Sequence, residues 1–112
     1  SQAEINAGLK TNVTLFTKPP GEQFADLMDE VNRVYSIGLN QRKHKRETPG
    51  DDDGSFIKAG FPIAIMNVGS FPYADPNYHL ETDIPELVDI QNLWMSTQAS
   101  LAAGLSVDLG EM

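Results

Sequence analysis

Two groups of side chains in this sequence could do metal or acid–base chemistry. One is the acidic cluster Asp51-Asp52-Asp53, which stands directly before Gly54, and the other is His79, with Asp83 four residues later. A neutral imidazole is a good zinc ligand, and carboxylate oxygens suit calcium. The chain holds no cysteine, so a disulfide framework and a cysteine-based zinc site are both excluded.

The acidic cluster has a structural interpretation as well as a calcium-binding one. A calcium loop of the EF-hand type needs ligands at alternating positions and a Glu at the twelfth, and that spacing is absent. Asp52 or Asp53 would instead cap a short helix over residues 55–59, ended by Gly60. We therefore favour a helix cap and keep calcium as the alternative.

The second histidine, His44, lies in the basic run Arg42-Lys43-His44-Lys45-Arg46, where neighbouring cations oppose metal binding. This run fits a solvated loop or an edge strand, with an anion-binding patch as the alternative. The formal net charge of −8 argues against nucleic acid or an anionic membrane as a partner. No apolar run approaches the roughly 18 residues of a membrane span.

These side chains must be positioned by strands and helices, and the first half of the chain predicts one βα unit. Residues 11–16 read as a strand with both faces at least partly covered, ended by the proline pair that follows. Residues 22–37 predict an amphipathic helix, after which a parallel strand is expected. Its apolar stripe consists of Phe24, Leu27, Met28, Val31, Val34 and Tyr35.

The second half predicts a strand, a long loop and a closing helix. The apolar run 63–68 fits a buried parallel strand, and loop 70–82 follows it, at the end of the sheet where α/β proteins bind ligands. Asp83 is expected to cap the last helix, with Pro85 and Glu86 in its first turn. Its apolar positions fall along one face: Leu87, Ile90, Leu93, Trp94, Thr97, Leu101 and Leu105.

Residues 50–103 resemble the C-terminal part of the zinc-dependent aminopeptidase family, which includes bacterial leucyl aminopeptidases, glutamate carboxypeptidases and glutaminyl cyclases. The similarity rests on four short stretches, and residues 11–37 are similar in layout to the preceding strand and helix. The stretches are Asp51-Asp52-Asp53-Gly54-Ser55-Phe56, Lys58-Ala59-Gly60-Phe61-Pro62, Asn77-Tyr78-His79 and Asp83.

The resemblance implies an α/β fold, a partial three-layer sandwich with a mostly parallel sheet, formed by residues 1–112 as one domain or fragment. It implies a zinc exopeptidase that removes N-terminal residues from peptides, in a secreted or periplasmic setting. His79 would be the last ligand of a two-zinc site, with Asp83 and Asp52 as second-shell or helix-capping groups. Phe71, Tyr73 and Tyr78 would help to form the wall of the substrate pocket.

The sequence also departs from this family. The family's remaining ligands, a His-x-Asp pair, a Glu-Glu pair and a further Asp, precede the part represented here, and neither pair occurs in this chain. One imidazole cannot hold a catalytic zinc, which needs about three protein ligands. We therefore expect the chain alone to be inactive. The alternative is a non-catalytic, truncated member that acts as a binding or oligomerisation module and self-associates through an exposed sheet edge.

Overall fold

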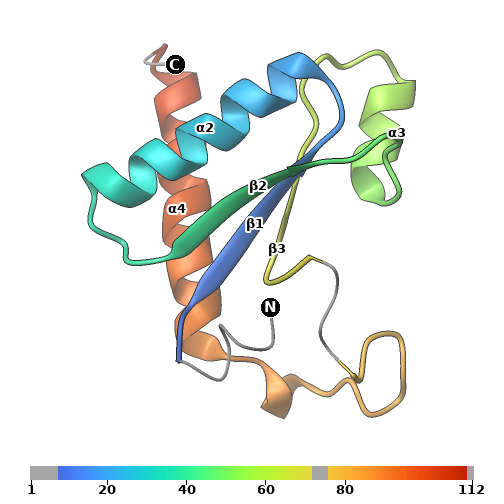
Figure 1. The fold of residues 1–112 in the computed structure, drawn as a ribbon, viewed down its shortest axis with the longest axis vertical. Helices are drawn as coiled ribbons and strands as arrows, with labels where there is room; N and C mark the ends of the chain where they lie inside the picture. Colours follow the sequence, from blue (N-terminus) through green and yellow to red (C-terminus); the bar gives the residue numbers. More distant parts are fainter. Residues whose placement is uncertain (1–7, 72–75, 111–112) are drawn as a thin grey trace.

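The computed structural model describes residues 8–71 and 76–110, which form a small α/β domain (Figure 1). The α/β class predicted from the sequence is confirmed. The elements in chain order are β1 (Thr11–Phe16), α2 (Pro19–Val34), β2 (Asn40–Lys45), α3 (Asp52–Lys58), β3 (Met66–Val68), the 3₁₀ helix η1 (Pro85–Leu87) and α4 (Ile90–Asp108).

The sheet has β1 at its centre, with β2 on one side and β3 on the other. β2 runs parallel to β1, from Thr11 opposite Asn40 to Phe16 opposite Lys45. Both flanking strands and the helices cover β1, so all six of its residues are buried, in agreement with the prediction for 11–16. β2 is the parallel strand expected after the first helix, and its basic sequence lies on an edge strand, one of the two structures that the run favoured.

The third strand contradicts the prediction for residues 63–68. β3 spans only Met66–Val68, is partly buried and runs antiparallel to β1, with Met66 opposite Leu15 and Val68 opposite Val13. The sheet is therefore mixed, and the prediction of a mostly parallel sheet was wrong. A parallel strand needs a crossover that returns the chain to the other end of the sheet. The seven-residue α3 stays near the end at which β2 finishes, so the chain enters β3 from there (Figure 1).

Helix α2 begins at Pro19, where a proline costs no hydrogen bond because the first N–H groups of a helix have no partner. It begins and ends three residues before the bounds predicted from the sequence. Gly21 allows the helix to approach β1 closely: a Cβ at this position would lie 3.0 Å from Cβ of Phe16. The start of α2 can therefore pack directly on β1, because Gly21 has no side chain in the way.

The main hydrophobic cluster joins α2 to α4, so the two long helices lie on the same side of the sheet. Helix α4 contributes little apolar volume to this cluster, because its buried members are Met95 and two alanines. The buried members are Leu27, Met28, Val31, Leu39, Met95, Ala99 and Ala103.

A hydrogen-bonded network of neutral polar side chains ties the three strands to one another and to α4. Asn12 Nδ2 donates to Gln41 Oε1 at 2.8 Å and to Asn67 Oδ1 at 3.2 Å. Thr14 Oγ1 donates to the same Asn67 oxygen at 2.7 Å, and Asn67 Nδ2 donates to Ser100 Oγ at 3.3 Å. Since Asn12 and Thr14 are almost fully buried, these bonds avoid the cost of unpaired polar groups and fix the register of the sheet.

The start of α4 differs from the prediction that Asp83 caps the last helix. Residues 85–87 form only η1, and α4 begins at Ile90 with Asp89 as its N-cap. Asp89 Oδ1 accepts the backbone N–H of Asn92 at 3.0 Å, and Lys10 Nζ donates to Asp89 Oδ2 at 2.7 Å. The hydrogen bond from Lys10, followed by that from the Asn92 amide, lowers the pKa of Asp89.

The first turn of α4 is also joined to the beginning of β1. The side chain of Asn92 accepts from the Thr11 N–H at 2.7 Å and donates to the Thr11 carbonyl at 2.9 Å. This two-point contact pairs main-chain groups of β1 that have no strand partner at that position. It sets the position of α4 on the sheet more specifically than apolar packing could.

Candidate functional site

His79, the predicted zinc ligand, lies at the tip of an exposed turn. The Leu80 N–H donates to the Asn77 carbonyl at 2.9 Å, and His79 at the third position of this turn has a φ of 62°. A positive φ at that position is typical of a type II turn, where glycine is preferred. The imidazole stacks on the ring of Tyr78, with the ring centroids 4.0 Å apart.

The residues around His79 do not complete a metal site. Within residues 8–71 and 76–110, no three His, Asp or Glu side chains lie close enough together to hold a metal ion. Asp83 is exposed, and its N–H donates to the Leu80 carbonyl in a second turn. A catalytic zinc needs about three protein ligands, so this part of the chain does not fit the two-zinc centre implied by the resemblance.

The acidic cluster forms ion pairs with Arg46, which the sequence analysis did not predict. Arg46 Nη2 lies 2.6 Å from Asp53 Oδ2, and Arg46 Nη1 lies 3.1 Å from Asp51 Oδ2. Burial alone would lower the pKa of Arg46, but the hydrogen bonds to Asp53 and Asp51 outweigh it and raise the pKa. Two of the three carboxylates thus share the single positive charge of Arg46, which favours a structural role for the cluster over a calcium site.

The prediction that Asp52 or Asp53 is the N-cap of the short helix was wrong. The N-cap residue of α3 is Asp51, whose side chain makes no capping hydrogen bond, and Asp52 is an exposed residue of the first turn. Asp53 is fully buried instead, because it pairs with Arg46 and accepts the Asp51 N–H at 3.3 Å. The cluster attaches α3 to the end of β2.

The predicted pocket aromatics are dispersed. Phe71 packs against His44, with ring centroids 4.6 Å apart, and Tyr78 stacks on His79. Tyr73 lies outside the described residues. Because β3 is antiparallel, its last residue, Val68, lies opposite Val13, and the chain leaves β3 toward the beginning of β1. The prediction had been the opposite, a loop that follows the carboxyl end of a parallel strand.

A cavity of about 880 Å³ lies between β1, β3 and α4, and both apolar and uncharged polar side chains line it. Neither His79 nor Phe71 nor Tyr78 lines it. Its two charged groups, Lys10 and Asp89, are already paired with each other. This cavity therefore does not assemble the predicted site residues.

Helix α4 carries the largest concentration of exposed apolar side chains among the described elements. From Ile90 to Val107 it contains no charged residue. At about 100° per residue, the face opposite the buried Ala99 carries Thr97 and Asp108 together with large apolar side chains that are each at least half exposed. With the flanking positions these are Ile90, Leu93, Trp94, Leu101, Leu105 and Leu109. All of them except Leu109 were predicted from the sequence to share one face, and that face points away from the sheet.

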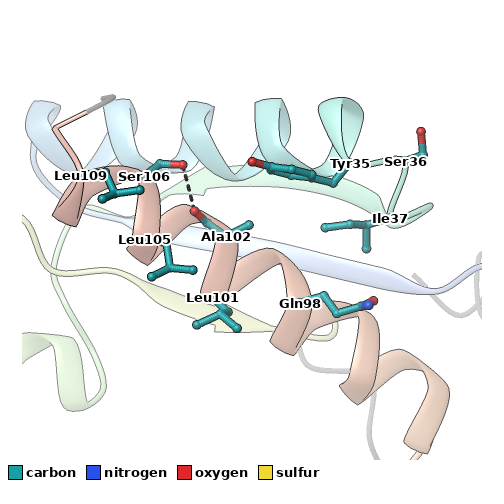
Figure 2. Close-up of a pocket in the computed structure, with 9 residues that line it drawn as sticks. All are labelled: Tyr35, Ser36, Ile37, Gln98, Leu101, Ala102, Leu105, Ser106 and Leu109. Atoms are coloured by element: carbon teal, nitrogen blue, oxygen red, sulfur yellow. Dashed lines mark hydrogen bonds between the residues drawn. The ribbon is translucent and has the colours of Figure 1, made fainter.

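Beside this face is a groove of about 520 Å³ between α4 and the turn after α2 (Figure 2). Tyr35 and Ile37 form one wall, and Leu101, Ala102 and Leu105 form the other. Ser36, Gln98 and Ser106 add polar groups at its margins, and Leu109 completes the lining. Figure 2 shows the Tyr35 ring above the side of α4 that carries Ala102, with Leu101 and Leu105 pointing away from the ring.

Comparison with protein-family models, with curated proteins and with solved structures gave no match. In residues 8–71 and 76–110 there is also no helix with the length and apolarity required to cross a bilayer. The candidate site is therefore defined by geometry alone. It consists of the outer face of α4 and the adjoining groove.

Most residues of this face, but not the groove, were predicted from the sequence. Tyr35 was assigned to the apolar stripe of the first helix, yet it is exposed at the end of α2. The available signal was the composition of α4: a helix that is apolar on all sides is normally covered on all sides. The alanines at positions 99 and 103 form the side of α4 that packs on α2, which leaves the large apolar side chains on the other side.

Proposed function

We propose that this chain is an oligomerisation module that binds a second copy of itself through the outer face of α4. This is the alternative function left open by the sequence, with the surface on a helix rather than at a sheet edge. The exposed apolar face of α4 is the observation that carries it. Large apolar side chains gathered on one side of a helix stabilise a protein only when something covers them.

The size of the face supports a specific interface. From their exposed fractions, the six side chains together present on the order of 700 Å². That exceeds the apolar patch of about 300–600 Å² carried by a typical monomer and approaches the 800 Å² or so that each partner buries in a standard interface. The face includes Trp94, and tryptophan is among the residue types most enriched in binding hot spots.

The charge distribution favours a second copy on this face over the sheet edges. The edge strand β2 carries Arg42, Lys43 and Lys45, and charged side chains on an edge oppose pairing with another strand. The other edge, β3, has only three residues. Two chains of net charge −8 repel each other, but residues 90–107 of α4 carry no charge, so contact along this part of the helix adds little to that repulsion.

Paired substitutions test this proposal. Leu101→Glu places a charge in the centre of the face, and Leu80→Glu is the control, because Leu80 is exposed to nearly the same extent (58%, against 61% for Leu101) but lies in the turn after His79. Light scattering should give a dimer for the wild type and for Leu80→Glu, and a monomer for Leu101→Glu. A wild type that stays monomeric, or a Leu101→Glu variant that stays dimeric, would refute the proposal.

A zinc exopeptidase is the second candidate, and the conformation of His79 favours it. A non-glycine residue with positive φ is often found at functional sites, and its imidazole is exposed and able to reach a ligand set from outside these residues. Zinc would supply a Lewis acid and activated water in such an enzyme. Zinc content and aminoacyl-substrate turnover of a longer protein containing this chain, with and without His79→Ala, would test it. Unchanged zinc content in the variant would reject His79 as a ligand.

A further inference from the structure

We propose that the two copies pair through antiparallel α4 helices and that Trp94 of each copy inserts into the groove beside α4 of the other. This inference rests on the proposed self-association and specifies its geometry. It assigns a binding role to the groove shown in Figure 2, and the ligand of that groove is the indole ring of a second copy.

The spacing of large side chains on α4 is self-complementary in the antiparallel direction. If the two-fold axis passes between Thr97 and Gln98, residues at equal distances from it along the helix face each other. Ile90 then lies opposite Leu105, and Trp94 lies opposite Leu101. Four of the six large side chains of the face, Ile90, Trp94, Leu101 and Leu105, thus meet another large apolar side chain.

The parallel arrangement is less favourable on three counts. It would place the two Trp94 rings at the same level, bring the two Asp89 carboxylates together and align the two helix dipoles. In the antiparallel pair the dipoles oppose each other. Asp108, on the outer face one turn after Leu105, then lies near the positive N-terminal end of the partner helix.

In the antiparallel pair, the Trp94 ring of one copy lies next to the groove of the other copy. Leu101 is both the residue opposite Trp94 and part of the groove wall. At about 100° per residue, Trp94 is displaced from the centre of the face toward the same side as Gln98 and Leu105. A two-fold axis perpendicular to both helices places this flank of each helix on the same side of the dimer. The ring of Trp94 therefore approaches the groove rather than the opposite flank.

The chemistry of the groove suits an indole. Tyr35 and Ile37 offer apolar and aromatic surface, and a buried tryptophan needs an acceptor for its N–H. The Gln98 amide oxygen at the margin can supply it. The groove has a volume of about 520 Å³, which is large enough to contain an indole ring. Trp94 is 58% exposed in the single chain, so little rearrangement is required.

Cysteine cross-linking tests the arrangement directly, because the chain has no cysteine of its own. Thr97→Cys places a thiol beside the axis, and Asp108→Cys places one at the far end of the same face. We expect a bifunctional thiol reagent of short span to link two copies of Thr97→Cys and not two copies of Asp108→Cys. Efficient linking of both variants would indicate parallel helices and overturn this inference while leaving self-association intact.

A groove-specific variant tests the insertion of Trp94. Tyr35→Ala alters the wall contributed by the end of α2 and leaves the apolar face of α4 unchanged. It should weaken dimerisation about tenfold, as should Trp94→Ala, with a smaller loss for Trp94→Phe. A dimer that Tyr35→Ala leaves unchanged would show that the groove is not the site, even if α4 pairs. A wild type that is monomeric at every concentration would refute self-association itself.

Discussion

Ala99 and Leu101, two residues apart on α4, face opposite environments. The side chain of Ala99 is fully buried against α2, whereas Leu101 is 61% exposed. The inner face of the helix is made of small residues and the outer face of large ones. The helix therefore packs closely on its own domain and directs its greater apolar surface outward.

Trp94 is the chain's only tryptophan, so its fluorescence reports directly on the outer face of α4. We predict that its emission lies at shorter wavelength in concentrated wild-type protein and shifts to longer wavelength on dilution, because dissociation returns the ring to water. In Leu101→Glu the emission should be at the longer wavelength throughout. Emission and acrylamide quenching that do not change with concentration would contradict burial of Trp94 in a dimer.

The Arg46–Asp53 pair is predicted to hold α3 against the end of β2. Asp53→Ala leaves a largely buried guanidinium with only Asp51 as partner and should lower the free energy of unfolding by about 2–3 kcal/mol. Asp52→Ala is the matched control and should change it by less than about 0.5 kcal/mol, because Asp52 is exposed. Urea denaturation at one protein concentration measures both. Equal effects of the two variants would contradict the assignment.

Asp89, rather than Asp83, is predicted to cap the last helix. Asp89→Ala should destabilise the protein by about 1 kcal/mol, through loss of the hydrogen bond to the Asn92 amide. Asp83→Ala should have almost no effect. If urea denaturation ranks the two variants in the reverse order, the helix begins where the sequence pattern had placed it.

The same carboxylate should make stability depend on pH. The pKa of Asp89 is lowered from its ordinary value of 3.8, so the folded state releases this proton more readily than the unfolded state. The stabilisation is present in full above that value and is lost as the pH falls through the lower pKa of the folded state. The difference in unfolding midpoint between wild type and Asp89→Ala should therefore shrink on acidification. A difference that persists at the lowest pH would show that Asp89 acts by another route.

His79 is predicted not to make this chain a tight zinc-binding protein. Titration of wild type and His79→Ala with zinc should give the same weak response, because no second and third ligand lie near His79 in the described residues. Stoichiometric tight binding that is lost in the variant would instead support the metallopeptidase proposal.

The parts of the fold that the sequence predicted are those set by local patterns. The stripe containing Leu27, Met28 and Val31 has helical spacing, and the two prolines before it determine where the strand must end. The charged strand β2 is on an edge because buried positions would not accept its lysines. These features depend on neighbours in the chain and can be read without knowing the tertiary structure.

The direction of β3 and the pairing of the acidic cluster depend on distant parts of the chain. An apolar run does not specify whether its partner is parallel, and here the short α3 decides it by staying at one end of the sheet. Likewise, three adjacent aspartates do not show that Arg46 will form ion pairs with two of them. The direction of β3 and the ion pairs of Arg46 both depend on the tertiary arrangement of the chain.

The orientation of α4 was missed for a different reason. Periodicity correctly grouped Ile90, Trp94, Leu101 and Leu105 on one face, but periodicity cannot distinguish a face that meets its own core from one that meets a partner. Small residues such as Ala99 give a weak hydrophobic signal, although they permit the closest packing. An uncharged helix with apolar residues on both sides was the cue.

Sedimentation equilibrium of the wild-type chain over a wide concentration range tests the central claim most directly. Self-association through α4 predicts a reversible change from a 12.3 kDa species at low concentration to twice that mass at high concentration. It also predicts that Leu101→Glu sediments as a single 12.3 kDa species throughout. A wild-type mass of 12.3 kDa at every concentration would contradict it.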